Sequence, residues 1–249
     1  MDNDRKTLGI IGGMGPMATA DLFYKIIANT DASTDAGHIH IVIDNNPKIP
    51  DRTAAVLSDS DAPLPYIVEA AQLLVRMGAD VLLLPCNTSH VYYERLCDAV
   101  NMPVINMIEE TAAQTAAMGI ERVGLLATKG TLHARLYEKS LSAYGVDAVL
   151  PSARGQSDVM SLIYNGVKAG AETFDTTKIC GELRRMARRG AVAFILGCTE
   201  LPVAFERYHI PFPYIDPSLI LAKAAILRAG YAIKPSDPAV FVTEDPSSA

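Results

Sequence analysis

The fold is decided by Val81-Leu82-Leu83-Leu84-Pro85-Cys86-Asn87-Thr88, because Ala193-Phe194-Ile195-Leu196-Gly197-Cys198-Thr199 repeats its pattern later in the chain. The two cysteines are 112 residues apart. A second pair of similar strings, Leu8–Gly12 and Val123–Ala127, is offset by 115 residues. Two matches at nearly the same spacing indicate a duplicated unit.

Short apolar runs alternate with amphipathic stretches along the whole chain, which is typical of β-α units on parallel sheets. We expect strands at 7–11, 38–43, 81–84, 104–107, 122–127, 147–150, 192–196 and 213–215. We expect helices at 17–29, 64–77, 89–100, 110–118, 132–144, 158–168, 177–189 and 219–229. This alternation would also fit a single β/α barrel.

The duplication favours an α/β fold of two similar Rossmann-like three-layer domains, each with a parallel sheet, related by a pseudo-twofold axis. Residues 1–117 plus 216–249 would form the first domain, which carries Cys86, and residues 118–215 the second, which carries Cys198. Ligands of such sheets bind beyond the carboxyl ends of the strands. Because both cysteines follow apolar runs, we expect the active site in the cleft between the domains.

The composition excludes several classes of protein. With 49% hydrophobic and 20% charged residues in 249, the chain is globular. Its net charge of -6 and its single basic cluster, 184–189, argue against a nucleic-acid partner. No apolar run approaches the ~18 residues of a membrane span. Four cysteines without a C-x-x-C pair indicate a reducing, cytoplasmic location rather than a disulfide scaffold.

Cys86 and Cys198 are the strongest candidates for chemistry. Each comes just before an expected helix start, where the helix dipole lowers the pKa of a thiol. Two thiols on either side of a substrate carbon, roughly 7 Å apart, could remove a proton from one face and return one to the other. The plainer alternative is that both are small buried hydrophobic residues.

Five strings in order along the chain resemble those of the cofactor-independent aspartate racemases, within the aspartate/glutamate racemase superfamily. They are Gly12-Gly13-Met14-Gly15-Pro16, Pro50-Asp51-Arg52-Thr53, Pro85-Cys86-Asn87-Thr88, Ala127-Thr128-Lys129-Gly130-Thr131 and Gly197-Cys198-Thr199-Glu200. The resemblance spans about Thr7 to Tyr231. It implies a homodimer that interconverts L- and D-aspartate without pyridoxal phosphate.

The resemblance also implies roles for individual residues. Cys86 and Cys198 would be the paired acid/base catalysts, with Cys198 acting on the L-enantiomer and Cys86 on the D-enantiomer, as in related glutamate racemases. Arg52 and Lys168 match the two basic residues at the substrate, and an acidic protein that binds a dicarboxylate needs such local cations. Further substrate-binding candidates are Met14, Asn87, Thr88, Thr128, Thr131, Thr199 and Glu200.

Purely structural roles for these residues also fit the sequence. Arg52 and Lys168 could form surface salt bridges, and the threonines could simply cap helices. Glu200 could raise the pKa of Cys198, orient the substrate ammonium group, or only complement the helix dipole. His90, four residues after Cys86, either reaches the mouth of the cleft or is an ordinary residue at a helix start.

Other functions also remain possible. Gly13-x-Gly15-x-x-Ala18 matches a dinucleotide fingerprint, but Asp44 lies 31 residues after Gly13 instead of about 20. His38-x-His40 lacks an evident third metal ligand. The chain could be a racemase for glutamate or for several amino acids, a dicarboxylate lyase or isomerase, or a protein that binds amino acids without catalysis. The Asn45–Thr53 loop could act as a lid.

Overall fold

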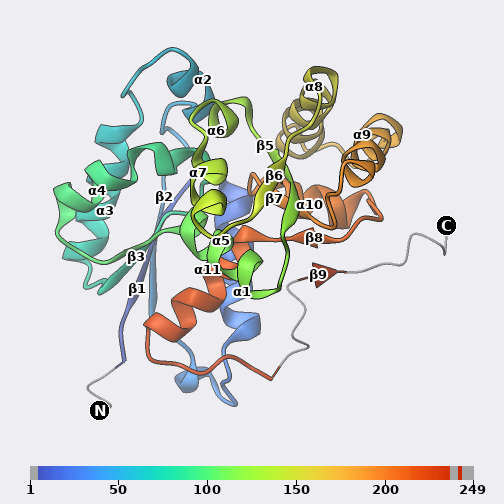
Figure 1. Ribbon diagram of the computed structural model, residues 1–249. Coiled ribbons are helices and arrows are strands. Elements are labelled where there is room, and N and C mark those ends of the chain that lie inside the picture. Colours follow the sequence, from blue (N-terminus) through green and yellow to red (C-terminus); the bar gives the residue numbers. More distant parts are fainter. Residues whose placement is uncertain (1–4, 236–240, 243–249) are drawn as a thin grey trace.

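Two sheets with the same strand order form the core of the computed structural model, which describes residues 5–235 and 241–242 (Figure 1). The first sheet has the order β2-β1-β3-β4 and the second the order β6-β5-β7-β8-β9. All neighbouring strands are parallel except β8 and β9. The strands are β1 (Leu8–Gly12), β2 (Ile41–Asn45), β3 (Val81–Leu83), β4 (Val104–Ile105), β5 (Arg122–Ala127), β6 (Asp147–Val149), β7 (Phe194–Gly197), β8 (Tyr214–Ile215) and β9 (Phe241–Val242).

Helices cover both faces of each sheet, which confirms the expected fold of two three-layer α/β domains. They are α1 (Pro16–Asn29), α2 (Arg52–Leu57), α3 (Leu64–Arg76), α4 (Tyr93–Val100), α5 (Met107–Ala117), α6 (Lys129–His133), α7 (Leu136–Ala143), α8 (Ala153–Ser161), α9 (Thr177–Arg188), α10 (Glu200–Arg207) and α11 (Pro217–Arg228). Two short 3-10 helices, η1 (Asp35–Gly37) and η2 (Thr88–Tyr92), and a π-helix, η3 (Leu162–Lys168), complete the order.

Alternate residues of each central strand pack into different cores, because side chains of a strand point to opposite faces of its sheet. In β1, Ile10 joins the core beneath α1 and α11, whereas Ile11 joins the core beneath α3. In β5, Leu126 packs against α8 and α9, whereas Leu125 packs against α5 and α7. The near-continuous apolar runs of the sequence are therefore strands buried on both faces.

Several elements differ from the sequence-based expectation. The expected helix 132–144 is two helices, α6 and α7, separated at Arg135, which has a left-handed φ of 53°. Thr128 caps α6 by accepting a hydrogen bond from the N–H of Thr131, so that helix begins early. Helix α2, which begins at the end of the Asn45–Thr53 loop, was not expected. Helix α10 begins at Glu200, where a helix start was expected after Cys198 although no helix range was given.

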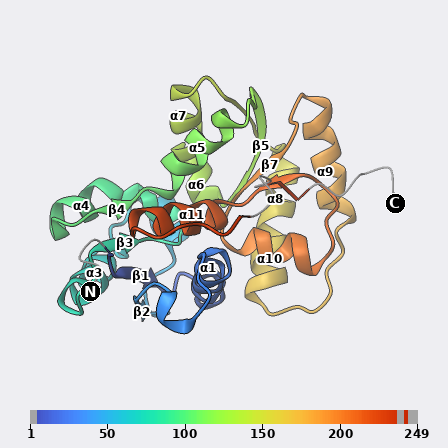
Figure 2. The ribbon, with the colours of Figure 1, turned by 90° about the horizontal axis from the view of Figure 1, so that it is seen from below.

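Helix α11 returns to the first lobe and lies between α1 and α5 (Figure 2). Its apolar residues share a core with β1 and β3. Strand β9, which we had placed with the first domain, pairs with β8 of the second sheet. We propose the domain boundaries expected from the sequence, with 241–242 moved to the second domain.

Candidate active site

A small cavity opens between the two lobes, at the carboxyl ends of the central strands. Its volume is only about 20 Å³, room for about one water molecule, so the lining side chains lie close together around it. Its lining comes from both domains: Met14, Asp51, Arg52, Thr53, Cys86, Asn87, Thr88, Thr128, Lys168, Cys198, Thr199 and Glu200. We call this space the site cavity. It contains every site residue expected from the sequence except Thr131.

The two cysteines line this cavity with opposite charges beside them. Both are buried and free of disulfides. Arg52 is the charged neighbour of Cys86. The thiol of Cys198 instead donates a hydrogen bond to Glu200 Oε2 at 2.9 Å. The duplicated strand ends therefore carry chemically different thiols.

Cys198 is protonated in this arrangement. Burial raises the pKa of the Cys198 thiol well above its usual value, and the charge and hydrogen bond of Glu200 raise it further. Lys168 opposes this shift without reversing it. The expectation that the helix start lowers the pKa of this thiol is wrong, because desolvation and a neighbouring carboxylate outweigh the helix dipole.

The two expected cations both reach the site cavity and both keep their charge. Burial disfavours the charge of Arg52, but Cys86, Asp51 and Glu200 together outweigh burial and raise the pKa of Arg52. Arg52 Nη1 donates to two backbone carbonyls, while its Nε is buried without a partner. For Lys168, burial is likewise outweighed by Glu200 and Cys198, which raise the pKa of the lysine. Lys168 ends η3, a π-helix of the kind often found at functional sites.

Three buried threonine hydroxyls join the domains at the wall of the cavity. Thr88 Oγ1 lies 3.0 Å from Thr128 Oγ1 and 2.9 Å from Thr131 Oγ1. Thr128 and Thr131 are also hydrogen-bonded to each other, at 3.2 Å. Thr131 does not line the cavity itself, so its contribution is to hold the two threonines that do.

Asp51 and Thr53 line the site cavity although the sequence-based list omitted them. Both belong to the string Pro50-Asp51-Arg52-Thr53, in which only the cation of Arg52 had suggested a role. Asp51 caps α2 by accepting from the N–H of Ala54, and it also accepts from the hydroxyl of Tyr164 in the second domain. The resemblance of the whole string to the aspartate racemases was the sequence signal that could have identified both residues.

The family follows from a comparison with known proteins. The model of the Asp/Glu/Hydantoin racemase family matches residues 11–225. The chain belongs to this family. An aspartate racemase of Picrophilus torridus has 33% sequence identity and a TM-score of 0.78, with 92% of this chain and 96% of that one covered.

Relatives with other substrates are also similar. A broad specificity amino-acid racemase of Bacillus subtilis is 30% identical over 225 residues, which are 88% of this chain and 96% of the relative. A glutamate racemase of Francisella tularensis, solved with D-glutamate, covers 94% of this chain and 86% of its own with a TM-score of 0.69. Its identity of 17% shows the shared fold alone.

A wider hollow lies outside the site cavity of this racemase. Its volume is about 420 Å³, and it shares Asp51, Arg52, Lys168 and Glu200 with the cavity. The residues common to both spaces are therefore two cations and two carboxylates.

His90 holds the backbone of Cys86 from behind. It is buried, with Nδ1 3.0 Å from the Cys86 carbonyl oxygen. Its Nε2 accepts a hydrogen bond from the N–H of Met107 at 3.1 Å, so Nδ1 carries the proton. Burial lowers the pKa of His90 to about 4, and the ring is neutral near pH 7. His90 therefore does not reach the mouth of the cleft.

Within 5–235 and 241–242, no group of three or more His, Cys, Asp or Glu side chains is placed to hold a metal ion. In the same residues, no helix is both long enough and apolar enough to cross a bilayer.

Proposed function

We propose that this racemase interconverts L- and D-aspartate without a cofactor, with Cys86 and Cys198 as its two acid/base groups. The observation that carries the proposal is that both cysteines line one small cavity together with Arg52 and Lys168. A cavity with two thiols and two cations fits a dicarboxylic amino acid whose α-proton is exchanged. Binding alone would need no pair of thiols.

The different surroundings of the two cysteines give the reaction a starting state. Cys198 holds its proton and acts as the acid, while Cys86 acts as the base and removes the α-proton from the opposite face. The α-carbon then takes the proton of Cys198, and Cys86 keeps the one it removed. After this turnover Cys86 carries a proton and Cys198 does not, which is the state that reacts with the other enantiomer. A second turnover in the opposite direction restores the starting state.

The charge that develops on the α-carbon needs stabilisation, because this proton is only weakly acidic. Arg52 and Lys168 supply fixed positive charge in a site with little water. Two buried donors in the lining, Arg52 Nε and Asn87 Nδ2, have no partner. Since buried donors in folded proteins are almost always paired, these two are suited to the carboxylates of a substrate.

If Cys198 acts on L-aspartate, as the resemblance to glutamate racemases implies, the resting enzyme takes D-aspartate first. The broad specificity relative from Bacillus subtilis favours a second candidate, a racemase that also accepts other amino acids.

The test follows the α-proton of each enantiomer by NMR in D₂O, together with optical rotation, using reduced and cofactor-free protein. We expect L-aspartate to give D-aspartate that carries deuterium, while the remaining L-aspartate keeps its proton at early times. Cys86→Ala and Cys198→Ala should each abolish racemisation. Cys97→Ala, which changes a cysteine outside the site cavity, should retain it.

Three results would contradict the proposal. Signals of a new product would favour a lyase or isomerase. An unchanged spectrum of aspartate, with exchange of glutamate or another amino acid, would shift the substrate assignment. Binding of aspartate without any exchange would indicate a binding protein.

We further propose a cytoplasmic homodimer that uses the outer face of α1. All residues of α1 that are exposed to solvent are apolar: Pro16, Met17, Ala20, Phe23, Tyr24 and Ile27. A continuous apolar face of this kind marks an interface. Light scattering should give about twice the chain mass of 26.7 kDa, and Tyr24→Glu should shift the protein to monomer. A wild-type monomer would contradict this assignment.

A further inference from the structure

Tyr137 of α7 contacts the loops of both cysteines without lining the site cavity. Its hydroxyl donates a hydrogen bond to Asn87 Oδ1 at 2.5 Å, directly after Cys86. Its ring lies against Gly197, directly before Cys198, where an added Cβ would be 3.0 Å from the ring. The first unit has Pro85 at the position of Gly197. A side chain at position 197 would push the ring of Tyr137 away from the end of β7.

The tyrosine can act on Asn87 only as a donor. It is fully buried, and burial raises the pKa of its hydroxyl far above the usual value. Asp216 and Cys198 raise this pKa further, while a hydrogen bond with Thr111 opposes the shift. The hydroxyl therefore keeps its proton near neutral pH.

The hydrogen bond from the Tyr137 hydroxyl fixes which end of the Asn87 amide faces the substrate. An amide offers one acceptor oxygen and one NH₂ group, and the two ends are similar in shape. With the oxygen engaged by Tyr137, the NH₂ group is held in place. This Nδ2 is buried, has no partner, and belongs to a residue that lines the site cavity.

We propose that Tyr137 is a positioning residue that locks the Asn87 amide with its NH₂ group toward the site cavity, where it binds a carboxylate of the amino-acid substrate. This inference rests on the proposed function for its substrate. Tyr137 belongs to the second domain and Asn87 to the first, so the donor is oriented only when the domains are correctly apposed. Without the hydroxyl, the amide can turn its oxygen toward the anion and repel it.

Tyr137→Phe tests the lock, because it keeps the ring against Gly197 and removes only the hydroxyl. We expect the KM for aspartate to rise about tenfold, the effect of one lost hydrogen bond, with kcat within about twofold. Asn87→Ala should raise the KM at least as much. In the Asn87→Ala background, Tyr137→Phe should have no further effect on KM.

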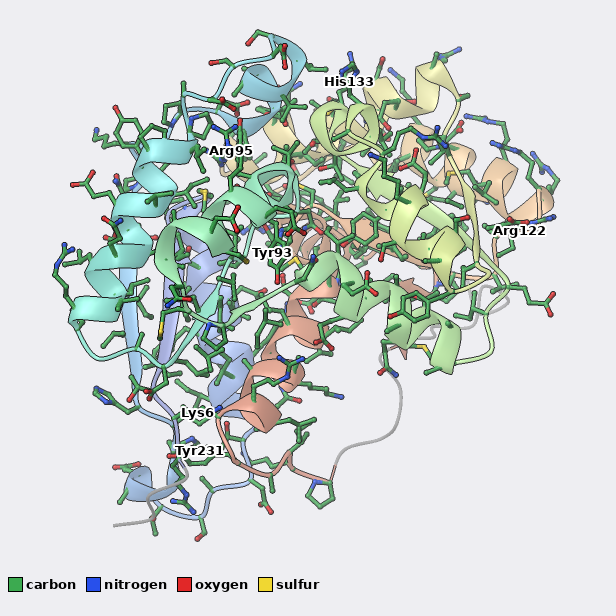
Figure 3. The ribbon with its side chains drawn as sticks, turned by 60° about the vertical axis from the view of Figure 1, so that its left-hand side comes forward. Lys6, Tyr93, Arg95, Arg122, His133 and Tyr231 are labelled. Atoms are coloured by element: carbon green, nitrogen blue, oxygen red, sulfur yellow. The ribbon has the colours of Figure 1, made fainter. Side chains whose placement is uncertain are left out.

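Tyr93→Phe is the matched control, since the hydroxyl of Tyr93 donates to the backbone oxygen of Val104 instead (Figure 3). It should leave KM unchanged. A wild-type KM in Tyr137→Phe, or KM effects that simply add in the double variant, would overturn the inference. A purely structural role would lower the melting temperature without this split between KM and kcat.

A readout without substrate separates this inference from the proposed function. The side-chain NH₂ signals of Asn87 in a ¹⁵N–¹H NMR spectrum are identified by their loss in Asn87→Ala. We expect Tyr137→Phe to shift them and Tyr93→Phe to leave them in place. If the Asn87 NH₂ signals do not move in Tyr137→Phe, Tyr137 does not fix the orientation of the Asn87 amide. If the signals move but the wild type does not racemise aspartate, Tyr137 does orient the amide and the assigned substrate is wrong.

Discussion

The neutral His90 ring makes the stability of the protein depend on pH in a predictable direction. In the unfolded chain a histidine binds a proton below about pH 6.5, whereas in the folded protein burial lowers the pKa of His90 to about 4. Between these values the unfolded state binds more protons, so the free energy of unfolding falls as the pH falls. The loss from this group reaches about 2.5 kcal/mol between pH 7.5 and pH 4.5.

The assay is urea unfolding from pH 7.5 to pH 4.5 for the wild type and for His90→Gln. Glutamine does not titrate, and it offers one donor and one acceptor in place of the two ring nitrogens. The wild type should lose about 2.5 kcal/mol more than this variant over the range, or roughly 5–10 °C in melting temperature. His133→Gln, which replaces an exposed histidine, should follow the wild-type curve (Figure 3). Parallel curves for the wild type and His90→Gln would refute the reasoning.

Three further changes have expected outcomes. Glu200→Gln removes the carboxylate that helps raise the pKa of Cys198, so alkylation of this thiol by iodoacetamide at pH 8 should become about tenfold faster by mass spectrometry; an unchanged rate would assign the shift to burial alone. Lys25→Met leaves the two aspartates that it bridges, at 2.5 and 2.7 Å, without a cation, and urea unfolding should show a loss of about 3–5 kcal/mol. Gly13→Ala should prevent folding or cost more than about 3 kcal/mol, since its Cβ would lie 2.2 Å from neighbouring backbone. Gly78→Ala, with a similar φ of +91° and open space around it, should cost only about 1 kcal/mol in thermal unfolding.

The sequence alone determined the architecture because the signals for it are local and repeated. Apolar runs, capping residues and the repeated sequence pattern around Cys86 and Cys198 indicated two α/β units with thiols at equivalent strand ends. The same repeated pattern predicted that side chains from both units would meet, since the carboxyl ends of parallel strands are where such sheets bind ligands. Ten of the eleven site residues expected from the sequence line the site cavity, and the eleventh, Thr131, contacts two of them without lining it.

The chemical state of the site was decided only by tertiary structure. The helix start suggested a lower pKa for Cys198, but its true surroundings, full burial and a bonded Glu200, raise that pKa. Asn87 likewise reads as a helix cap until Tyr137, from the other domain, engages its oxygen. Sequence patterns report which residues are neighbours along the chain. Desolvation, charge and hydrogen bonding depend on which groups packing brings together across domains, and these set the protonation and orientation of the groups that face the substrate.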